Sequence, residues 1–245
     1  MRRIKLIVAY DGTNYCGWQV QPNGNSVQAE LERHLSDLLK EEIRITGASR
    51  TDAGVHALGN VAVFDTNARM PAEKVSFALN TRLPADIRIQ DSCEVPMNFH
   101  PRFANTVKTY EYKIFNSRFP DPTKRLYSFF YYYPLDVEKM KEAAAYLVGE
   151  HDFKSFCTAK PEVENTVRTV YSLEICKEEK LITIRIRGNG FLYNMVRIIA
   201  GTLIRVGGGG MEPQEVKHIL EARNRELAGD TARPEGLTLV KIEYV

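Results

Sequence analysis

A run of small residues surrounds an arginine and an aspartate in the first quarter of the sequence, at residues 47–57 (GASRTDAGVHA). Small neighbours let the backbone or a base of another molecule come close to Arg50 and Asp52. A carboxylate beside an arginine stays ionised and oriented, which suits a nucleophile better than a general acid. The spacing leaves a second interpretation open, a tight turn in which Asp52 caps backbone N–H groups and pairs with Arg50. For His56, at the entry of a predicted strand, we expect a hydrogen-bonded structural role.

A second candidate is a strand that carries tyrosines, residues 108–112 (KTYEY). Lys108, Tyr110 and Tyr112 alternate along it, so they share one face of the strand. Aromatic rings presented on a sheet beside a cation are a common means of stacking unpaired nucleic-acid bases. Ordinary packing of tyrosines on a half-buried strand explains the same pattern, and the sequence alone leaves both explanations open.

The third candidate is Arg197, which lies inside an apolar stretch at residues 190–203 (GFLYNMVRIIAGTL). A helix this apolar is buried, and an arginine within it needs an anion. We expect that anion to be a carboxylate from elsewhere in the chain, and Asp52 is the one in a sharp loop. A purely structural ion pair is the competing explanation. The glycines at 207–210 lack the GK[ST] ending of a P-loop, so they do not predict a nucleotide site.

Two sets of alternating strands and amphipathic helices must position these candidates. The first half predicts the order β-α-β-β-α-β, which is typical of ferredoxin-like folds. Asn25 or Ser26 is expected to cap its first helix, whose apolar face includes Val27, Leu31 and Leu35. The other elements of this half are strand 4–10, a short strand at 43–45, strand 61–65, a helix from Pro71 through Leu79, and strand 87–95.

The second half predicts strand 107–115 with a partner at 127–135, a helix capped by Asp136, a hairpin of 166–176 and 181–188, a buried helix at 191–206, a helix after Pro213 and a last strand at 236–244. We therefore predict an α+β fold of two ferredoxin-like, RRM-like halves around a pseudo-twofold axis. The halves are expected to share a mostly antiparallel sheet with helices packed on one side. The N-terminal half, residues 1–104, would carry the aspartate loop, and the C-terminal half, residues 105–245, the tyrosine strand and the arginine helix.

Composition and charge exclude several classes of protein. The chain has 245 residues, 44% of them hydrophobic and 26% charged, which excludes a disordered or collagen-like protein. Its apolar runs fall short of the ~18 residues of a membrane span, and its four scattered cysteines form no CxxC pair. We therefore expect a cytoplasmic protein with reduced thiols, no metal and no membrane contact. The net charge of +2 does not decide whether the partner is a polyanion, because a local cluster of cations suffices to bind one.

Taken together, the three candidate segments resemble the TruA family of tRNA pseudouridine synthases. Residues 49–57 (SRTDAGVHA) match its catalytic signature, and residues 10–21 (YDGTNYCGWQVQ) its N-terminal signature. The tyrosine strand, the arginine helix and residues 233–244 (RPEGLTLVKIEY) match its other motifs, so the likeness spans essentially the whole chain. Ser49 departs from the pattern, in which glycine is common before RTD, and residues 115–130 fit less distinctly.

The resemblance implies an isomerase that converts uridine to pseudouridine at positions 38, 39 and 40 in the anticodon stem-loop of tRNA. It implies a homodimer, no metal and no organic cofactor. The N-glycosidic bond must break and the uracil must turn before C5 bonds to C1′. A stacked helix leaves no room for this, so the nucleotide is expected to flip out of the stem.

The resemblance also implies roles for individual residues. Asp52 is expected to be the nucleophilic carboxylate, acting at C1′ or initiating glycal formation. Tyr110 is expected to pack on the flipped uracil, and it is a candidate acceptor of the C5 proton. Arg197 is expected to pair with Asp52 and hold it ionised. Three further residues are expected to bind the substrate: Arg50 as a wedge in the vacated space, Leu237 as a wall of the base pocket, and Lys108 on the tyrosine strand.

Two alternatives belong to other classes. A non-catalytic RNA-binding module built on RRM-like halves predicts tight binding without chemistry, and the missing RNP-type string argues against it. A hydrolase that uses Asp52 and His56 lacks support, because the sequence offers no nucleophilic serine or cysteine motif and no metal cluster. A chelator titration and a substitution of His56 would separate the hydrolase from the isomerase.

Overall fold

The computed structural model describes residues 1–22, 24–158 and 165–245. These residues form two compact units, here called unit 1 (residues 1–105 and 239–245) and unit 2 (residues 106–238). The predicted division placed all of 105–245 in the second half, whereas the last seven residues lie with unit 1. The reason is strand pairing, because the end of the last strand is a neighbour of a strand in unit 1.

Unit 1 is built on strands in the order β4-β1-β3-β10, with β1 antiparallel to both β3 and β4. Along β1 every second residue is buried, as the alternation of the sequence predicts: Ile4, Leu6, Val8 and Tyr10. The strands are β1 (Arg2–Tyr10), β2 (Thr46–Gly47), which pairs with β3, β3 (His56–Thr66), β4 (Ile87–Val95) and β10 (Leu237–Tyr244), which enters unit 1 at Leu239.

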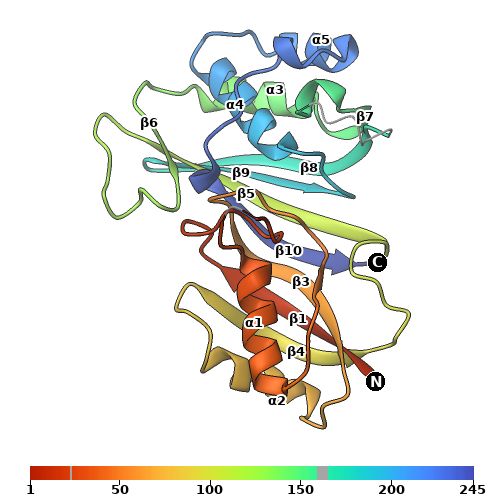
Figure 1. The fold of residues 1–245 in the computed structure, drawn as a ribbon. Helices are drawn as coiled ribbons and strands as arrows, with labels where there is room; N and C mark the ends of the chain where they lie inside the picture. Colours follow the sequence, from red (N-terminus) through yellow and green to blue (C-terminus); the bar gives the residue numbers. More distant parts are fainter. Residues whose placement is uncertain (23, 159–164) are drawn as a thin grey trace. The chain divides into compact units, whose positions relative to one another are not determined.

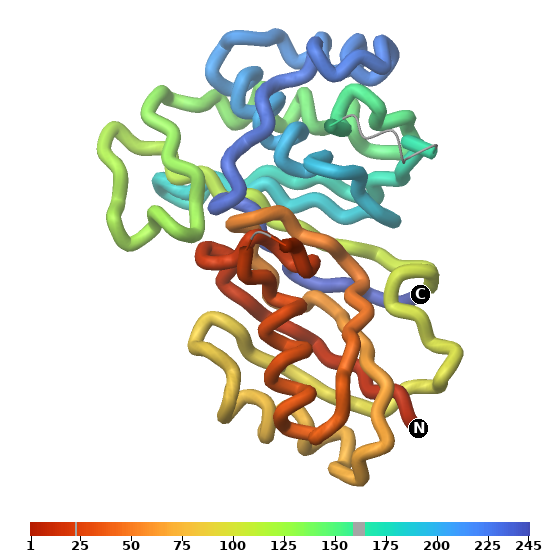
Figure 2. Tube along the Cα trace, viewed as in Figure 1, coloured from red at the N-terminus to blue at the C-terminus, as the bar shows by residue number. Residues whose placement is uncertain are grey.

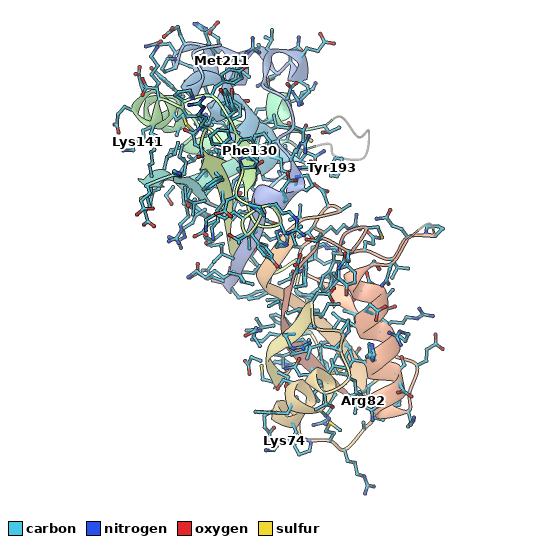
Figure 3. The ribbon with its side chains drawn as sticks, turned by 90° about the vertical axis from the view of Figure 1, so that its left-hand side faces the viewer. Lys74, Arg82, Phe130, Lys141, Tyr193 and Met211 are labelled. Atoms are coloured by element: carbon cyan, nitrogen blue, oxygen red, sulfur yellow. The ribbon has the colours of Figure 1, made fainter. Side chains whose placement is uncertain are left out.

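Two helices, α1 (Val27–Leu39) and α2 (Ala72–Asn80), contact one another and cover one face of these strands (Figure 1). Ser26 caps α1 as predicted, because its hydroxyl accepts from the N–H of Ala29 at 3.2 Å. Val27, Leu31 and Leu35 are fully buried, which confirms the predicted apolar face. Lys74 of α2 and Arg82 of the turn that follows it are both exposed, and Arg82 donates to the carboxylate of Asp37 in α1 at 3.0 Å (Figure 3).

Unit 2 is also mainly antiparallel, with strands in the order β5-β9-β8-β7. Its strands are β5 (Thr106–Asn116), β6 (Phe129–Tyr131), β7 (Gly149–Asp152), β8 (Val167–Glu178) and β9 (Leu181–Gly188). Its helices α3 (Val137–Ala145), α4 (Met195–Gly207) and α5 (Glu215–Ala222) lie on one side of these strands (Figures 1 and 2). The α+β fold class predicted from the sequence is therefore confirmed.

Two elements of unit 2 differ from the prediction. The strand expected at 127–135 is reduced to β6, and it runs parallel to β5. The side-chain amide of Asn116 donates to the carbonyls of Tyr131 and Tyr133. Beyond β6, these side-chain hydrogen bonds take the place of backbone hydrogen bonds between strands. Helix α4 starts at Met195 instead of residue 191, because Asn194 adopts φ 61°, outside the helical region. The predicted cap of α3 is confirmed, since Asp136 accepts from two backbone N–H groups of its first turn.

None of the described helices combines the length and apolar character that a membrane span requires.

Candidate active site

The loop between β2 and β3 presents Arg50 and Asp52 while it buries the residues on either side of Arg50. Ser49 and Thr51 are buried, whereas Arg50 is exposed and Asp52 is partly exposed. The hydroxyls of Tyr10 and Thr51 lie 2.7 Å apart, within hydrogen-bond distance. This alternation holds the loop from its inner side, so the two candidate side chains point away from the core.

Asn60 strengthens the same anchoring from β3. Its side-chain amide donates to the carbonyl of Ser49 at 3.1 Å, and its amide oxygen accepts from the N–H of Val61 at 3.0 Å. Asn60 is fully buried. A buried amide with both ends paired restricts the loop more than packing alone would, because each broken bond leaves an unpaired polar group.

The N-terminal loop, residues 11–18, forms the platform on which the aspartate loop rests. Trp18 N–H donates to the carbonyl of Thr51 at 3.1 Å, and Gly54 N–H donates to that of Tyr15 at 3.4 Å. A Cβ at Gly12 would lie 2.0 Å from the carbonyl oxygen of Val55. The two loops therefore touch through their backbones, which only glycine permits at this position.

Gly17 and Trp18 complete this platform. Gly17 has φ 104°, and a Cβ there would lie 2.5 Å from the carbonyl oxygen of Thr51. The ring of Trp18, which is 1% exposed, lies so close to Gly47 that a Cβ on Gly47 would come within 2.3 Å of the indole nitrogen. In the sequence, Gly17 and Trp18 stand only as part of the N-terminal signature at residues 10–21, without an individual role. The available signal was two glycines and the single tryptophan in one polar loop.

His56 joins both loops at the start of β3. Its Nδ1 accepts from the N–H of Gly12 at 3.1 Å and lies 3.2 Å from Oδ1 of Asp11. Its side chain is only 5% exposed. These contacts hold the buried ring against the N-terminal loop, which fits the structural role expected for His56.

In unit 2 the tyrosine strand is β5, and its two tyrosines differ in what they contact. Tyr110 is 7% exposed, and its ring meets Phe191 edge-on at a centroid distance of 5.2 Å. Tyr112 is fully buried, and its hydroxyl donates to the carbonyl of Arg233 at 2.9 Å. Burial raises the pKa of the Tyr112 phenol far above its usual value, and the charge of Glu235 raises it further. Tyr112 is thus committed to structure, which leaves Tyr110 as the candidate for base stacking.

Arg197 lies in the first turn of α4, and neutral acceptors orient its guanidinium. Its Nε donates to the carbonyl of Ala232 at 2.7 Å, and its Nη1 donates to Oδ1 of Asn194 at 3.0 Å. The left-handed conformation of Asn194 aims this amide at the arginine, while its nitrogen donates to Thr158 at 3.0 Å. Arg197 belongs to unit 2 and Asp52 to unit 1, and the ion pair predicted between them stays a prediction.

The segment at 232–237 connects the other candidates of unit 2. Arg197 and Tyr112 hold its first two carbonyls, and Gly236 packs so closely on Tyr112 that a Cβ would lie 2.7 Å from its ring. Leu237, which follows, is 6% exposed. Lys108 lies opposite Gly188 in the pairing of β5 with β9. Unit 1 therefore brings together Arg50 and Asp52, and unit 2 holds the remaining candidates.

Within the described ranges, no group of three or more histidine, cysteine and acidic side chains could hold a metal ion. The polar candidates Asp52, Tyr110, Arg50, Arg197 and Lys108 supply a carboxylate, a phenol, two guanidinium groups and an ammonium group.

Comparison with known proteins gives a consistent result along the chain. The family model described as "tRNA pseudouridine synthase" matches residues 6–104 and 143–245. The chain is 49% identical to "tRNA pseudouridine synthase A" of Thermoanaerobacter sp. (strain X514) over 100% of both chains, and 47% identical to that of Acetivibrio thermocellus, again over 100% of both. It is 49% identical to that of Halalkalibacterium halodurans over 97% of this chain and 90% of the relative.

Proposed function

The chain belongs to the tRNA pseudouridine synthase family, and from this premise we propose that it forms pseudouridine at positions 38, 39 and 40 of the anticodon stem-loop. As a pseudouridine synthase it is an isomerase, and tRNA is its substrate. The observation that carries the proposal is the loop between β2 and β3, which presents Arg50 and Asp52 while both neighbours of Arg50 are buried.

Asp52 is the catalytic carboxylate in this proposal, and it acts at C1′ of the flipped nucleotide, either by direct attack or by initiating glycal formation. A nucleophile needs a fixed approach, because a small misplacement costs a large factor in rate. The platform of residues 11–18 supplies that fixity through the backbone contacts of Thr51, Gly54 and Val55.

Tyr110 packs on the flipped uracil and is the candidate acceptor of the C5 proton. Its ring is held by Phe191, so stacking costs it little conformational entropy. Arg197 keeps Asp52 ionised and aimed, and its own orientation is supported by Ala232 and Asn194. Both roles follow from the family resemblance of the residues, and the local geometry of unit 2 is compatible with them.

Three residues bind the tRNA around the reacting nucleotide. Arg50 fills the space that the flipped nucleotide leaves, which its exposed position on the aspartate loop supports. Leu237 forms part of the wall of the base pocket, and Lys108 faces the substrate from β5. We further propose a homodimer in which both subunits contact one tRNA, and a cytoplasmic location, which the free thiols of Cys16, Cys93, Cys157 and Cys176 support.

The test is tritium release from tRNA labelled at uracil C5, with purified protein in EDTA and Asp52→Asn as the control. We expect release by the wild type alone, up to one to three equivalents per tRNA, and mapping of the product to positions 38–40. Tritium release by Asp52→Asn at a rate comparable to that of the wild type would refute the assignment of Asp52 as the nucleophile. Tight tRNA binding by the wild type without release would favour the non-catalytic RNA-binding module.

A further inference from the structure

The turn at residues 100–103, between β4 and β5, is fixed by one of its own side chains. Nδ1 of His100 accepts from the N–H groups of Arg102 and Phe103, at 3.2 Å and 3.3 Å. A single acceptor that receives two successive N–H groups closes the turn much as an Asx turn does. The side chains of Arg102 and Phe103 therefore leave the backbone from a defined position.

Residues of the first and the last strand of the chain, β1 and β10, also hold this turn. Arg3, from β1, donates to the carbonyl of Phe99 at 2.9 Å. Tyr244, from the end of β10, donates to the carbonyl of Pro101 at 3.0 Å, and its ring packs on Phe99 at 5.0 Å. The segment between β4 and β5 runs beside the C-terminal end of the chain in Figure 2, in agreement with these contacts.

Phe103 is nevertheless 80% exposed at the tip of this anchored turn. One face of its ring stacks on His100 at a centroid distance of 4.2 Å and an interplanar angle of 20°. An exposed phenylalanine by itself is common on protein surfaces. A phenylalanine whose turn is held by Arg3, Tyr244 and His100 differs, because its ring is already ordered and a flat partner could stack on it at low entropic cost.

The neighbouring Arg102 points toward the aspartate loop. Its Nη2 donates to the carbonyl of Gly47 at 3.2 Å, three residues before Arg50. Partial burial lowers the pKa of Arg102, and the positive charge of Arg50 on the nearby aspartate loop lowers it further. No ion pair joins either arginine to a carboxylate within residues 1–22, 24–158 and 165–245. Two adjacent cations without a carboxylate favour the binding of an anion.

We propose that Arg102 holds a backbone phosphate of the tRNA substrate beside Arg50, and that the exposed ring of Phe103 stacks on a base next to that phosphate. This inference rests on the tRNA substrate of the proposed function and extends its binding surface by two residues. It leaves Arg50 in its proposed place at the reacting nucleotide and assigns the phosphate contact to Arg102.

RNA fits this surface better than an acidic peptide does. The guanidinium of Arg102 neutralises one backbone phosphate, and an ordered aromatic ring stacks on any base, which is how unpaired nucleotides are commonly bound. A peptide carboxylate would satisfy the arginines but would leave the outer face of Phe103 without a flat partner. Retained RNA binding in the variants below would count against RNA as the occupant.

The first experiment measures the dissociation constant of unmodified tRNA for Arg102→Ala at several salt concentrations. We expect about 10-fold weaker binding and a salt slope smaller by about one unit, because one phosphate contact is lost. Arg69→Ala is the matched control, because Arg69 is also an exposed arginine of unit 1 and its substitution removes the same positive charge. An affinity and a salt slope for Arg102→Ala equal to those of Arg69→Ala would overturn the proposal.

The second experiment separates a phosphate contact from a merely structural role of Arg102. Ethylation of one particular phosphate in the anticodon stem-loop is expected to weaken binding to the wild type. Ethylation of the same phosphate should not weaken binding to Arg102→Ala, because that variant has already lost the contact. Arg102→Lys is expected to keep the salt slope and to regain part of the affinity, because the charge is kept and the fork is lost. The same interference pattern for the wild type and for Arg102→Ala would assign Arg102 to the support of the Gly47 carbonyl alone.

The third experiment compares Phe103→Ala with Phe77→Ala, which removes a 70% exposed ring from α2. Loss of a stacked base predicts about 10-fold weaker tRNA binding for Phe103→Ala and an unchanged salt slope. Phe77→Ala is expected to bind as the wild type does, and equal affinities of the two variants would remove the stacking step. The positions of pseudouridine made by the wild type are mapped in parallel. Product outside positions 38–40 would contradict the proposed function, whereas unchanged tRNA binding by the variants would contradict the role of Arg102 and Phe103.

Discussion

The two units hold their candidate residues by different means. In unit 1, Arg50 and Asp52 stand on a loop whose position depends mainly on backbone contacts and on glycines that leave no space for a side chain, with the buried amide of Asn60 in support. In unit 2, Arg197 and Tyr110 stand on a helix and a strand, and side-chain contacts orient them. The loop is thus sensitive to any atom added beneath it, whereas unit 2 is sensitive to the loss of single hydrogen bonds.

The largest effect is expected for Asp52→Asn, which keeps the shape of the loop and removes the charge. Product formation should fall at least about 1,000-fold, because a neutral amide cannot serve as the nucleophile. Affinity for tRNA should stay within about two-fold, since the binding residues are untouched. Single-turnover kinetics and filter binding measure the two quantities, and Asp37→Asn, on the exposed side of α1, is the control. Equal losses of tRNA affinity and turnover would indicate that Asp52 has a structural role instead of a catalytic one.

The platform predicts the next largest effect for Gly17→Ala. The added Cβ would meet the carbonyl of Thr51 at 2.5 Å in a left-handed conformation, so the aspartate loop must shift. We expect a loss of about 3 kcal/mol in the free energy of unfolding. Turnover should fall about 100-fold as Asp52 moves.

Gly209→Ala is the matched control for this change. Gly209 also has a positive φ, 75°, but nothing lies within 4 Å of its added Cβ. Only the conformational cost of about 1 kcal/mol should remain there, with normal turnover. Denaturant unfolding and tritium release measure both variants, and similar results for the two would show that the platform does not position the loop.

In unit 2, Arg197→Met removes the oriented guanidinium and keeps the apolar stem. The hydrogen bonds to Ala232 and Asn194 are lost, which is expected to cost about 2 kcal/mol in stability and leaves the carbonyl of Ala232 without its donor. Turnover should fall about 30-fold if the guanidinium also supports Asp52. Arg197→Lys should recover part of the turnover. Melting and turnover like those of the wild type would contradict the predicted ion pair.

The smallest effect is expected for Tyr112→Phe. It removes only the hydroxyl that donates to the carbonyl of Arg233, and it should lower stability by about 1 kcal/mol and turnover by less than about three-fold. Tyr110→Phe on the same strand is the comparison. If Tyr110 accepts the C5 proton, that variant alone should slow tritium release. Identical kinetics of the two variants would limit Tyr110 to stacking.

Local patterns in the sequence were sufficient for most elements and for the three candidate segments. The alternation of β1, the cap at Ser26, the cap at Asp136 and the bounds of β4 follow from neighbouring residues, and the structure confirms them. The roles of Asp52, Tyr110 and Arg197 came from motifs in the same way, and they stay predictions. Periodicity, capping and motif spacing depend on residues that are close together in the sequence, so they can be recognised without knowledge of the tertiary structure.

The features that only the tertiary structure decided join residues far apart in the chain. Gly12 meets Val55, Trp18 lies on Gly47, and the turn at 100–103 is held by Arg3 and Tyr244. The short parallel β6 and the return of β10 to unit 1 are of the same kind. Each depends on which backbone atoms come into contact after the strands have paired. A glycine in the sequence allows such a contact, but the strand order and register determine what it meets.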